Sequence, residues 1–431
     1  MTTKTRIAIS VALQNAGQAI RALEIAKALR EFAPPGHDVD ITFVSHGSWF
    51  EPYVREAGFE IIRAQPQVEG RSTDEDMKFD PPELIGSAEL ARAFIEGQRE
   101  ALRELQPDLV LHSFWQVGSI AARLEGIPTI SFLPVAPSVV VDNLHKSRLG
   151  LVTQHNLTQA IIDSGWQGDP PTTIYDQVAA DLTIINDLPE FYAEIPLPRN
   201  TAITGPIFHD GTYGKQLDHQ LVHLLTVDDE RPKIFVTMGS SGTKQVLLEA
   251  VRAITNGAAT GNWTAIILAP SAIAPIDEVK QIIGSTPNIY ITDQFIPALP
   301  IAELADVVIT HGGQATLQTA LAGGTPVVGV AMQMEQQINL TNVTNFGAGI
   351  RISADQWRAP IIEDSIKKII NTESYQLRAQ ELAHLLHISS GRRHAAERIW
   401  QFVEEGLTTT SATGIRGQIS LARPWSGSEI M

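Results

Sequence analysis

A histidine followed by two glycines stands where an apolar run ends and a helix is expected to begin. These residues are His311, Gly312 and Gly313 in the stretch THGGQATLQTALAGGTP, and Thr316 falls in the first turn of the expected helix. Paired glycines let the backbone approach a ligand closely and adopt positive φ. A helix N-terminus offers free N–H groups and a partial positive charge. With the imidazole and the hydroxyl as further donors, the corner predicts a diphosphate site, against the simpler alternative of a helix start that the histidine merely caps.

Two further corners follow expected strands and carry polar groups. Ser240 and Ser241 follow a glycine in VTMGSSG, where small residues leave room for a ligand and present N–H and hydroxyl donors. Glu335 and Gln336, in MQMEQQIN, offer a carboxylate and an amide that could hold the hydroxyls of a polyol. Each corner taken singly also fits an ordinary turn or a solvated helix start. The combination is more specific than its parts.

Alternating apolar strands and amphipathic helices must position these corners. In the first half we expect a strand at 6–13, a helix at 17–30 and a strand at 107–113. The second half starts again with PKIFVT, and 360–405 is strongly helical. Such alternation implies right-handed crossovers and parallel sheets with helices on both faces. Ligands of these sheets bind outside the carboxyl ends of the strands, where the three corners lie. The sequence therefore predicts an α/β fold.

Composition narrows the range of partners. The chain has 431 residues and a formal net charge of -16, which argues against nucleic acid because phosphate backbones are held by clustered Lys and Arg. It has no cysteine, so disulfides, thiolate metal sites and a cysteine nucleophile are excluded. No apolar run is long enough to span a bilayer, and the N-terminus shows no signal-peptide pattern. We expect a cytoplasmic protein whose partners are small molecules.

In this combination the sequence resembles the GT-B nucleotide-sugar glycosyltransferases, the family 1-like group of UDP-glycosyltransferases and bacterial macrolide glycosyltransferases. Their pattern is a strand, H-G-G-x-x-T/S, a helix, a second strand, and then an acidic residue with Gln and a following Asn. His311 to Thr316, Glu335 with Gln336, and Asn339 match it in register. The resemblance covers about 6–405 and is weakest between about 70 and 205.

The resemblance implies two Rossmann-like parallel-sheet domains that face a cleft. We place an N-terminal acceptor domain at 1–205, a linker at 206–230 and a C-terminal nucleotide-sugar domain at 231–388. A helix at 389–405 is expected to cross back to the N-terminal domain, and 406–431 is expected to be a loosely ordered tail.

The resemblance also implies the roles of the site residues. His311 and Thr316 would contact the donor diphosphate, and the carboxylate and amide after the next strand would hold sugar hydroxyls. The implied donor-binding residues are Ser240, Ser241, Phe295, Ile296, His311, Gly312, Gly313, Thr316, Thr319, Glu335 and Gln336. Transfer would invert the anomeric carbon without a metal ion, and no cofactor is implied besides the nucleotide-sugar co-substrate, in the first place a UDP-sugar.

The sequence departs from the family where the general base is expected. Gln18 replaces the usual histidine at the start of the first helix, and it has no pKa suited to a base. The aspartate that orients that histidine stands in a PDLVVxD context, and in PDLVLHS we place His112 there. Either His112 is the base while Gln18 positions the acceptor, or the acceptor is acidic and needs little help, or no transfer occurs.

A further departure concerns the nucleotide. Thr319 stands where many relatives, by the resemblance, carry a glutamate that holds the ribose hydroxyls, which leaves UDP, dTDP and GDP open as the nucleotide. Our prediction is a glycosyltransferase acting on a small-molecule or lipid-like acceptor. One alternative is a nucleotide-sugar-binding protein or accessory subunit that does not transfer the sugar. The other is a UDP-sugar 2-epimerase, which would need several carboxylates in the cleft, and the sequence offers no matching set.

Overall fold

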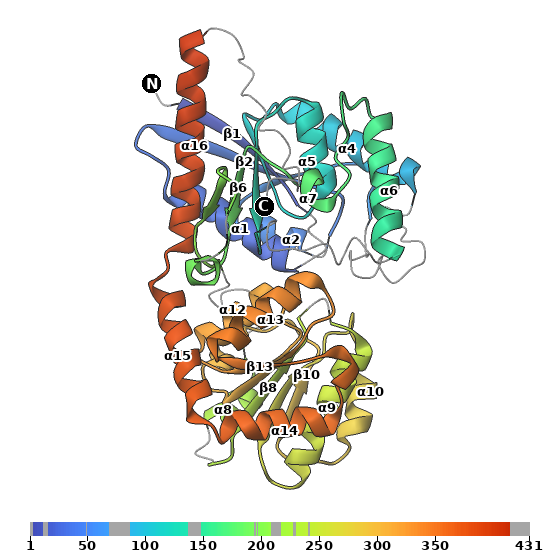
Figure 1. Cartoon of the computed structure of the whole chain (residues 1–431), viewed down its shortest axis with the longest axis vertical. Helices are drawn as coiled ribbons and strands as arrows, with labels where there is room; N and C mark the ends of the chain where they lie inside the picture. Colours follow the sequence, from blue (N-terminus) through green and yellow to red (C-terminus); the bar gives the residue numbers. More distant parts are fainter. Residues whose placement is uncertain are drawn as a thin grey trace. The chain divides into compact units, whose positions relative to one another are not determined.

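The computed structural model describes residues 3–11, 16–48, 50–68, 87–136, 148–193, 195, 197–207, 217–226, 230–239 and 242–413. The chain forms two compact units. The first joins Met1–Ile207 to Ser390–Met431, and the second is Phe208–Ser389. Each unit is built on one parallel sheet with helices around it (Figure 1). The predicted α/β class with two parallel-sheet domains is confirmed.

The elements of the first unit alternate as the sequence predicts. They are β1 (Thr3–Ser10), α1 (Ala16–Glu31), β2 (His37–Ser45), α2 (Glu51–Glu56), β3 (Glu60–Arg63), α4 (Ala88–Leu105), β4 (Leu109–His112), α5 (Gln116–Leu124), β5 (Thr129–Leu133), α6 (Arg148–Asp163), α7 (Ile174–Gln177), β6 (Leu182–Ile185), η3 (Pro189–Tyr192), β7 (Thr201–Ile203) and α16 (Gly391–Thr413).

In the described part of this unit the strand order is β3-β2-β1-β4-β5-β6-β7, and every neighbouring pair is parallel. Strands β4 and β5 are buried at every position, as parallel strands covered on both faces require. The chain runs outward from β1 to β3 and then returns to place β4 beside β1. The order therefore reverses between β1 and β4, the position where open α/β sheets bind ligands.

The helices of this unit divide between the two faces of its sheet. On one face, Ala101 of α4 and Ala121 of α5 pack against Val110 of β4. On the other face, the ring of Phe43 of β2 contacts Phe59, with the centroids 5.7 Å apart. The guanidinium of Arg30, near the end of α1, lies 3.8 Å from the Phe59 centroid. Helix α1 therefore covers the face opposite to α4 and α5, as right-handed crossovers in opposite directions demand.

The C-terminal helix α16 completes the first unit. Trp400 Nε1 donates a hydrogen bond to the carbonyl of Leu29 in α1 (3.2 Å), and Arg392 forms an ion pair with the buried Glu24 (3.0 Å). A Cβ on Gly391 would lie 2.1 Å from the carbonyl oxygen of Pro206, so only glycine fits at the first position of this helix. Helix α16 extends to Thr413, beyond the predicted limit at 405, and 414–431 lie outside the described residues.

The second unit repeats the same alternation. Its elements are α8 (His219–Thr226), β8 (Lys233–Thr237), α9 (Lys244–Ala259), β9 (Thr264–Leu268), α10 (Ile276–Ile283), β10 (Ile289–Thr292), α11 (Leu299–Ala302), β11 (Val307–Thr310), α12 (Gln314–Ala322), β12 (Val327–Val330), α13 (Met334–Phe346), β13 (Gly349–Ile352), η4 (Ala354–Gln356), α14 (Ala359–Ile370) and α15 (Glu373–Ile388).

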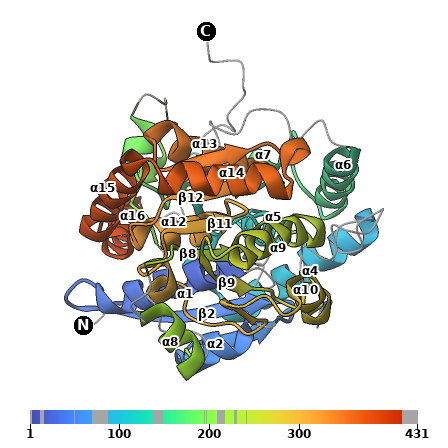
Figure 2. The same ribbon diagram turned by 90° about the horizontal axis from the view of Figure 1, so that it is seen from below.

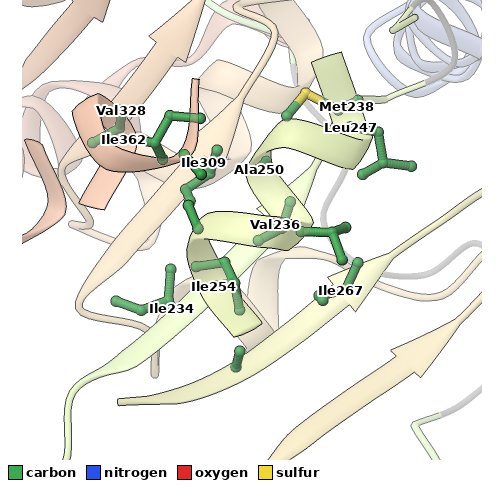
Figure 3. Close-up of a cluster of buried hydrophobic side chains, with 14 of the residues drawn as sticks. Ile234, Val236, Met238, Leu247, Ala250, Ile254, Ile267, Ile309, Val328 and Ile362 are labelled. Atoms are coloured by element: carbon green, nitrogen blue, oxygen red, sulfur yellow. The ribbon is translucent and has the colours of Figure 1, made fainter. Parts of the chain in front are cut away.

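Apolar side chains between the sheet and helices α9, α10 and α14 form a core of this unit. In the described residues the strand order is β10-β9-β8-β11-β12-β13, all parallel, and it reverses between β8 and β11. Figure 3 shows Leu247 and Ile254 of α9 against Val236 of β8. Helices α9 and α14 lie side by side (Figure 2), joined by a 2.9 Å hydrogen bond from Asn256 to Glu363.

The segment predicted as a linker contains structure of its own. Helix α8 lies within it, and Leu221 and Leu225 are buried. Asp218 just before the helix accepts a hydrogen bond from the Tyr290 hydroxyl of β10 (2.5 Å). A linker of polar composition can thus carry a short helix with buried apolar residues. Within the described residues, no helix combines the length and apolar character needed to cross a bilayer.

Candidate functional site

In the second unit the strand order reverses between β8 and β11, and the ends of these two strands form matching turns. Thr237 of β8 and Thr310 of β11 are neighbours in register. Each hydroxyl accepts a hydrogen bond from the N–H two residues on, from Gly239 (3.4 Å) and from Gly312 (3.3 Å). Both glycines have positive φ, at 55° and 82°. The two turns therefore hold two glycine-containing loops side by side at the carboxyl edge of the sheet.

Three of the predicted residues meet around one imidazole. A Cβ built on Gly239 would lie 2.6 Å from His311 Cε1 and 3.1 Å from Thr316 Oγ1. A Cβ on Gly313 would lie 2.4 Å from His311 Nε2. Any side chain at either glycine would occupy the space of the ring. The structure thus brings the HGG turn, the first turn of α12 and the end of β8 together, as the sequence motifs suggested separately.

His311 is uncharged at neutral pH. Its side chain is only 3% exposed, and burial lowers its pKa from 6.5 to about 4. Its Nδ1 is buried and has no hydrogen-bond partner among the described residues. A neutral imidazole carries one N–H, so it can give an anion a hydrogen bond but no positive charge. The positive potential at this corner must then come from the N-terminus of α12.

Helix α13 is held tightly against the HGG turn. A Cβ on Gly312 would lie 2.6 Å from Leu340 Cγ, and one on Gly329 would lie 2.3 Å from Leu340 Cδ2. Asn339 Nδ2 donates a hydrogen bond to the carbonyl of Gly312 (3.1 Å). The asparagine of the sequence motif therefore ties α13 to the turn. From the sequence alone, Asn339 is a motif match with no assigned role.

Glu335 and Gln336 both make internal hydrogen bonds. Glu335 Oε1 accepts from the N–H of Gln314 (3.1 Å), the first residue of α12, and from Asn339 Nδ2 (3.0 Å). The side-chain oxygen of Gln336 accepts from the backbone N–H groups of Met332 (2.9 Å) and Gln333 (3.2 Å) at the start of α13. Each side chain therefore organises a helix N-terminus, whatever it contributes to a ligand.

The residues predicted for the nucleotide are spread along the same unit. Phe295 is 44% exposed and follows β10, whereas Ile296 beside it is buried. The hydroxyl of Thr319 donates to the carbonyl of Ala315 one turn earlier (2.8 Å). Its hydrogen is therefore used within α12, although its lone pairs stay available as acceptors. Ser240 and Ser241 lie outside the described residues.

The prediction that His112 and Gln18 act together needs correction. The aspartate is the seventh residue of the pattern, and the seventh residue of PDLVLHS is Ser113. His112 pairs with Ser10 of β1, so its side chain lies on the sheet face that α4 and α5 cover. Gln18 lies in the first turn of α1, which covers the opposite face. The misplacement by one residue matters because neighbouring strand residues point to opposite faces.

His112 lacks the access that a general base needs. Its side chain is 0% exposed, and burial lowers its pKa to about 4. Nδ1 lies 3.2 Å from the carbonyl of Ser113, and Nε2 has no partner among the described residues. Ser113 is equally buried, and its hydroxyl has no partner in the described part of the chain. Neither residue presents an accessible base to a ligand.

A buried polar chain at the same edge of the first sheet was missed. The Ser10 hydroxyl donates to Gln98 Oε1 (2.8 Å), and Gln98 Nε2 lies 3.0 Å from His46 Nε2. His46 Nδ1 lies 2.9 Å from the carbonyl of Pro66. These contacts indicate a neutral His46 that donates through Nδ1, and burial lowers its pKa to about 4. The feature of the sequence that could have indicated this chain is the polar residue His46 directly after the strand VDITFVS.

Among the described residues, no three or more histidine or carboxylate side chains gather as a metal site would require. Residues 271–387 match the family model described as "Erythromycin biosynthesis protein CIII-like, C-terminal domain". This region contains the HGG turn, α12 and α13.

Whole-chain comparisons extend the likeness to both units. The chain is 25% identical over 332 residues to a PGL/p-HBAD biosynthesis glycosyltransferase of Mycobacterium tuberculosis, covering 70% of this chain and 72% of that protein. The crystal structure of the glycotransferase of kitacinnamycin superposes with a TM-score of 0.67 at 19% identity, covering 93% and 99% of the two chains. The spinosyn rhamnosyltransferase SpnG complexed with thymidine diphosphate gives 0.61 at 15% identity, covering 93% and 100%. The two parallel-sheet units therefore have the GT-B fold, and over most of its length the chain is similar to glycosyltransferases of this fold.

Proposed function

We propose that this glycosyltransferase takes its sugar from a nucleoside diphosphate sugar bound at the HGG corner of the second unit. The observation that carries the proposal is the meeting of His311, Gly239 and Thr316 in front of the N-terminus of α12. Amide N–H groups, an imidazole N–H and a hydroxyl are the donors that a diphosphate accepts from. The buried and unpartnered Nδ1 of His311 fits a corner that is completed by a ligand.

We propose direct displacement with inversion. An acceptor oxygen would attack the anomeric carbon while the bond to the diphosphate oxygen breaks, and the acceptor proton leaves with a base or with water. The helix N-terminus and the neutral donors would stabilise the charge that develops on the leaving diphosphate, so the step needs no divalent cation. A group accelerates the transfer only if it binds the leaving diphosphate more strongly in the transition state than in the ground state.

UDP and dTDP remain the two proposed nucleotides. UDP is the nucleotide of the UDP-glycosyltransferases that the sequence resembles. Thr319 lacks the carboxylate that would hold the two hydroxyls of a ribose, which favours a deoxyribose, and SpnG was crystallised with thymidine diphosphate. Phe295 is exposed on the loop after β10, where a flat apolar ring suits a pyrimidine base.

For the acceptor we propose a small or lipid-like molecule with an acidic hydroxyl or a carboxylate. Gln18 cannot take a proton, and His112 is buried on the other face of the first sheet. An acceptor that is already ionised near neutral pH needs no general base. The same two observations favour a second candidate, a nucleotide-sugar-binding protein that transfers nothing.

Thermal unfolding with UDP, dTDP, GDP and ADP tests the donor site. A nucleotide at a hundred times its dissociation constant should stabilise the second unit by about 2.7 kcal/mol, a rise of roughly 5–10 °C. The shift should be lost in His311→Ala and kept in His384→Ala, an exposed histidine of α15. No shift with any nucleotide at millimolar concentration would refute the donor site. If a nucleotide does bind, incubation of UDP-glucose or dTDP-glucose with phenols, carboxylic acids and alcohols separates transfer from binding alone.

A further inference from the structure

Glu335 places a negative charge at the end of the helix that the proposed diphosphate would use. Its Oε1 accepts the N–H of Gln314, the first residue of α12, at 3.1 Å. A carboxylate is the natural cap for such a terminus because it balances the partial positive charge there. The same terminus is the most positive element of the HGG corner, since the neighbouring His311 is neutral. Ligand phosphate and protein carboxylate therefore draw on one source of positive potential.

The carboxylate is fixed in this position. Asn339 Nδ2 bonds the same oxygen at 3.0 Å while also bonding the Gly312 carbonyl at 3.1 Å. Leu340 wedges α13 against the turn, and Gln336 closes the first turn of α13. A side chain held by two N–H donors on a clamped helix does not swing away at low cost. Its charge will thus be felt by any anion that binds at α12.

The two ligands of a transferase donor site differ in charge. In a nucleotide sugar, the outer phosphate is esterified to the sugar, whereas transfer leaves that phosphate as a terminal group with one more ionisable oxygen. A fixed carboxylate repels the product diphosphate more strongly than the donor by that extra charge. A single charge at this range changes affinity on the order of tenfold.

We propose that Glu335 positions the HGG turn and, through its charge, disfavours the nucleoside diphosphate product relative to the nucleotide sugar. The proposal rests on the donor site proposed above and adds a role in exchanging product for donor. A residue that only held sugar hydroxyls would affect the nucleotide sugar and leave the bare diphosphate untouched. The two roles therefore predict different effects of a substitution at Glu335 on the affinities for the bare diphosphate and for the nucleotide sugar.

Glu335→Gln is the informative substitution because the amide oxygen still accepts from Gln314 and Asn339 while the charge is lost. Calorimetric titration should compare UDP with UDP-glucose, and dTDP with dTDP-glucose. The control is Asp277→Asn, an exposed acid in the first turn of α10 in the same unit. We expect Glu335→Gln to bind the bare diphosphate tighter than the wild type does, and to gain roughly tenfold more affinity for the diphosphate than for the nucleotide sugar, while the control matches the wild type.

The outcomes separate this inference from the proposed function. If the wild type binds a diphosphate and Glu335→Gln binds it equally or more weakly, the inference is wrong and the donor site stands. If the wild type binds none of the four ligands, both fail. Melting temperatures without ligand check that Glu335→Gln folds, and Glu335→Ala, which loses the acceptor for Gln314, should melt below it.

Discussion

The space in front of Gly239 offers a sharp test of how the donor corner is built. Gly239→Ala would force alanine into a φ of 55° and place its Cβ 2.6 Å from His311 Cε1. The left-handed backbone costs about 1–2 kcal/mol for an L-residue. An ordinary contact begins at 3.4 Å, so the buried ring must also move by roughly 0.8 Å. Overpacking of this kind adds about 1–3 kcal/mol.

Gly261→Ala separates the two costs. Gly261, in the same unit, has a φ of 75° and nothing within 4 Å of the added Cβ. It should therefore lose only the backbone term, of about 1–2 kcal/mol. The difference between the two unfolding free energies, measured in urea, then reports the displacement of His311.

The functional consequence follows from the same displacement. If moving the ring weakens nucleotide binding tenfold, a nucleotide that stabilises the wild type by about 2.7 kcal/mol will stabilise Gly239→Ala by about 1.4 kcal/mol at the same concentration. Gly261→Ala should keep the full effect. Equal unfolding free energies for the two variants, together with an unchanged nucleotide effect, would refute the packing of His311 against Gly239.

Three further perturbations address other parts of the molecule. Asn339→Ala removes the bonds to the HGG turn and should weaken nucleotide binding several-fold in a calorimetric titration, whereas Asn345→Ala, exposed on the same helix, should not; equal affinities would mean that the turn holds itself. Gln98→Leu should lower the free energy of unfolding by about 2 kcal/mol, because two buried polar groups lose their partner; a wild-type urea midpoint would contradict the buried chain. Burial lowers the pKa of His46, His112 and His311 to about 4 from 6.5. Between these pH values the unfolded chain binds protons that the folded chain does not, so stability should fall as the pH decreases from about 6.5 towards 4, by roughly 1.4 kcal/mol per pH unit for each histidine. His112→Asn should reduce that slope by one histidine's share in urea titrations at several pH values, and an unchanged slope would mean that His112 is not buried as a neutral group.

Strand and helix types were predictable because strands buried on both faces appear as short apolar runs. PDLVLHS and ADVVITHGG contain β4 and β11, whose positions are all buried. The meeting of His311 with Gly239 was only partly predictable: both follow strands, but that β8 and β11 are neighbours depends on the chain order within the sheet. Helix α8 was missed because its eight residues stand in a segment rich in glycine and polar residues, and such a composition indicates a linker.

The error over His112 has a different origin. A strand reverses the direction of its side chains at every residue, so a shift of one position moves a side chain from one face of the sheet to the other. The comparison with the family pattern placed His112 at the position of the aspartate, which is Ser113. In the strand, these two neighbouring residues point to opposite faces of the sheet. The dual use of Glu335 was also beyond the sequence, because a hydrogen bond between residues 314 and 335 depends on how α13 packs against the HGG turn.

The division of the first unit between 1–207 and 390–431 affects how a ribosome would deliver this protein. The second unit is continuous in sequence and can reach its full set of contacts as soon as it has left the exit tunnel. The first unit cannot, because the partner of Leu29 is Trp400, which is translated much later. Until then the surface of α1 that receives α16 is open to water and to other nascent chains. The unit made first is thus the one finished last, and a chaperone would find its binding surface there rather than on the second unit.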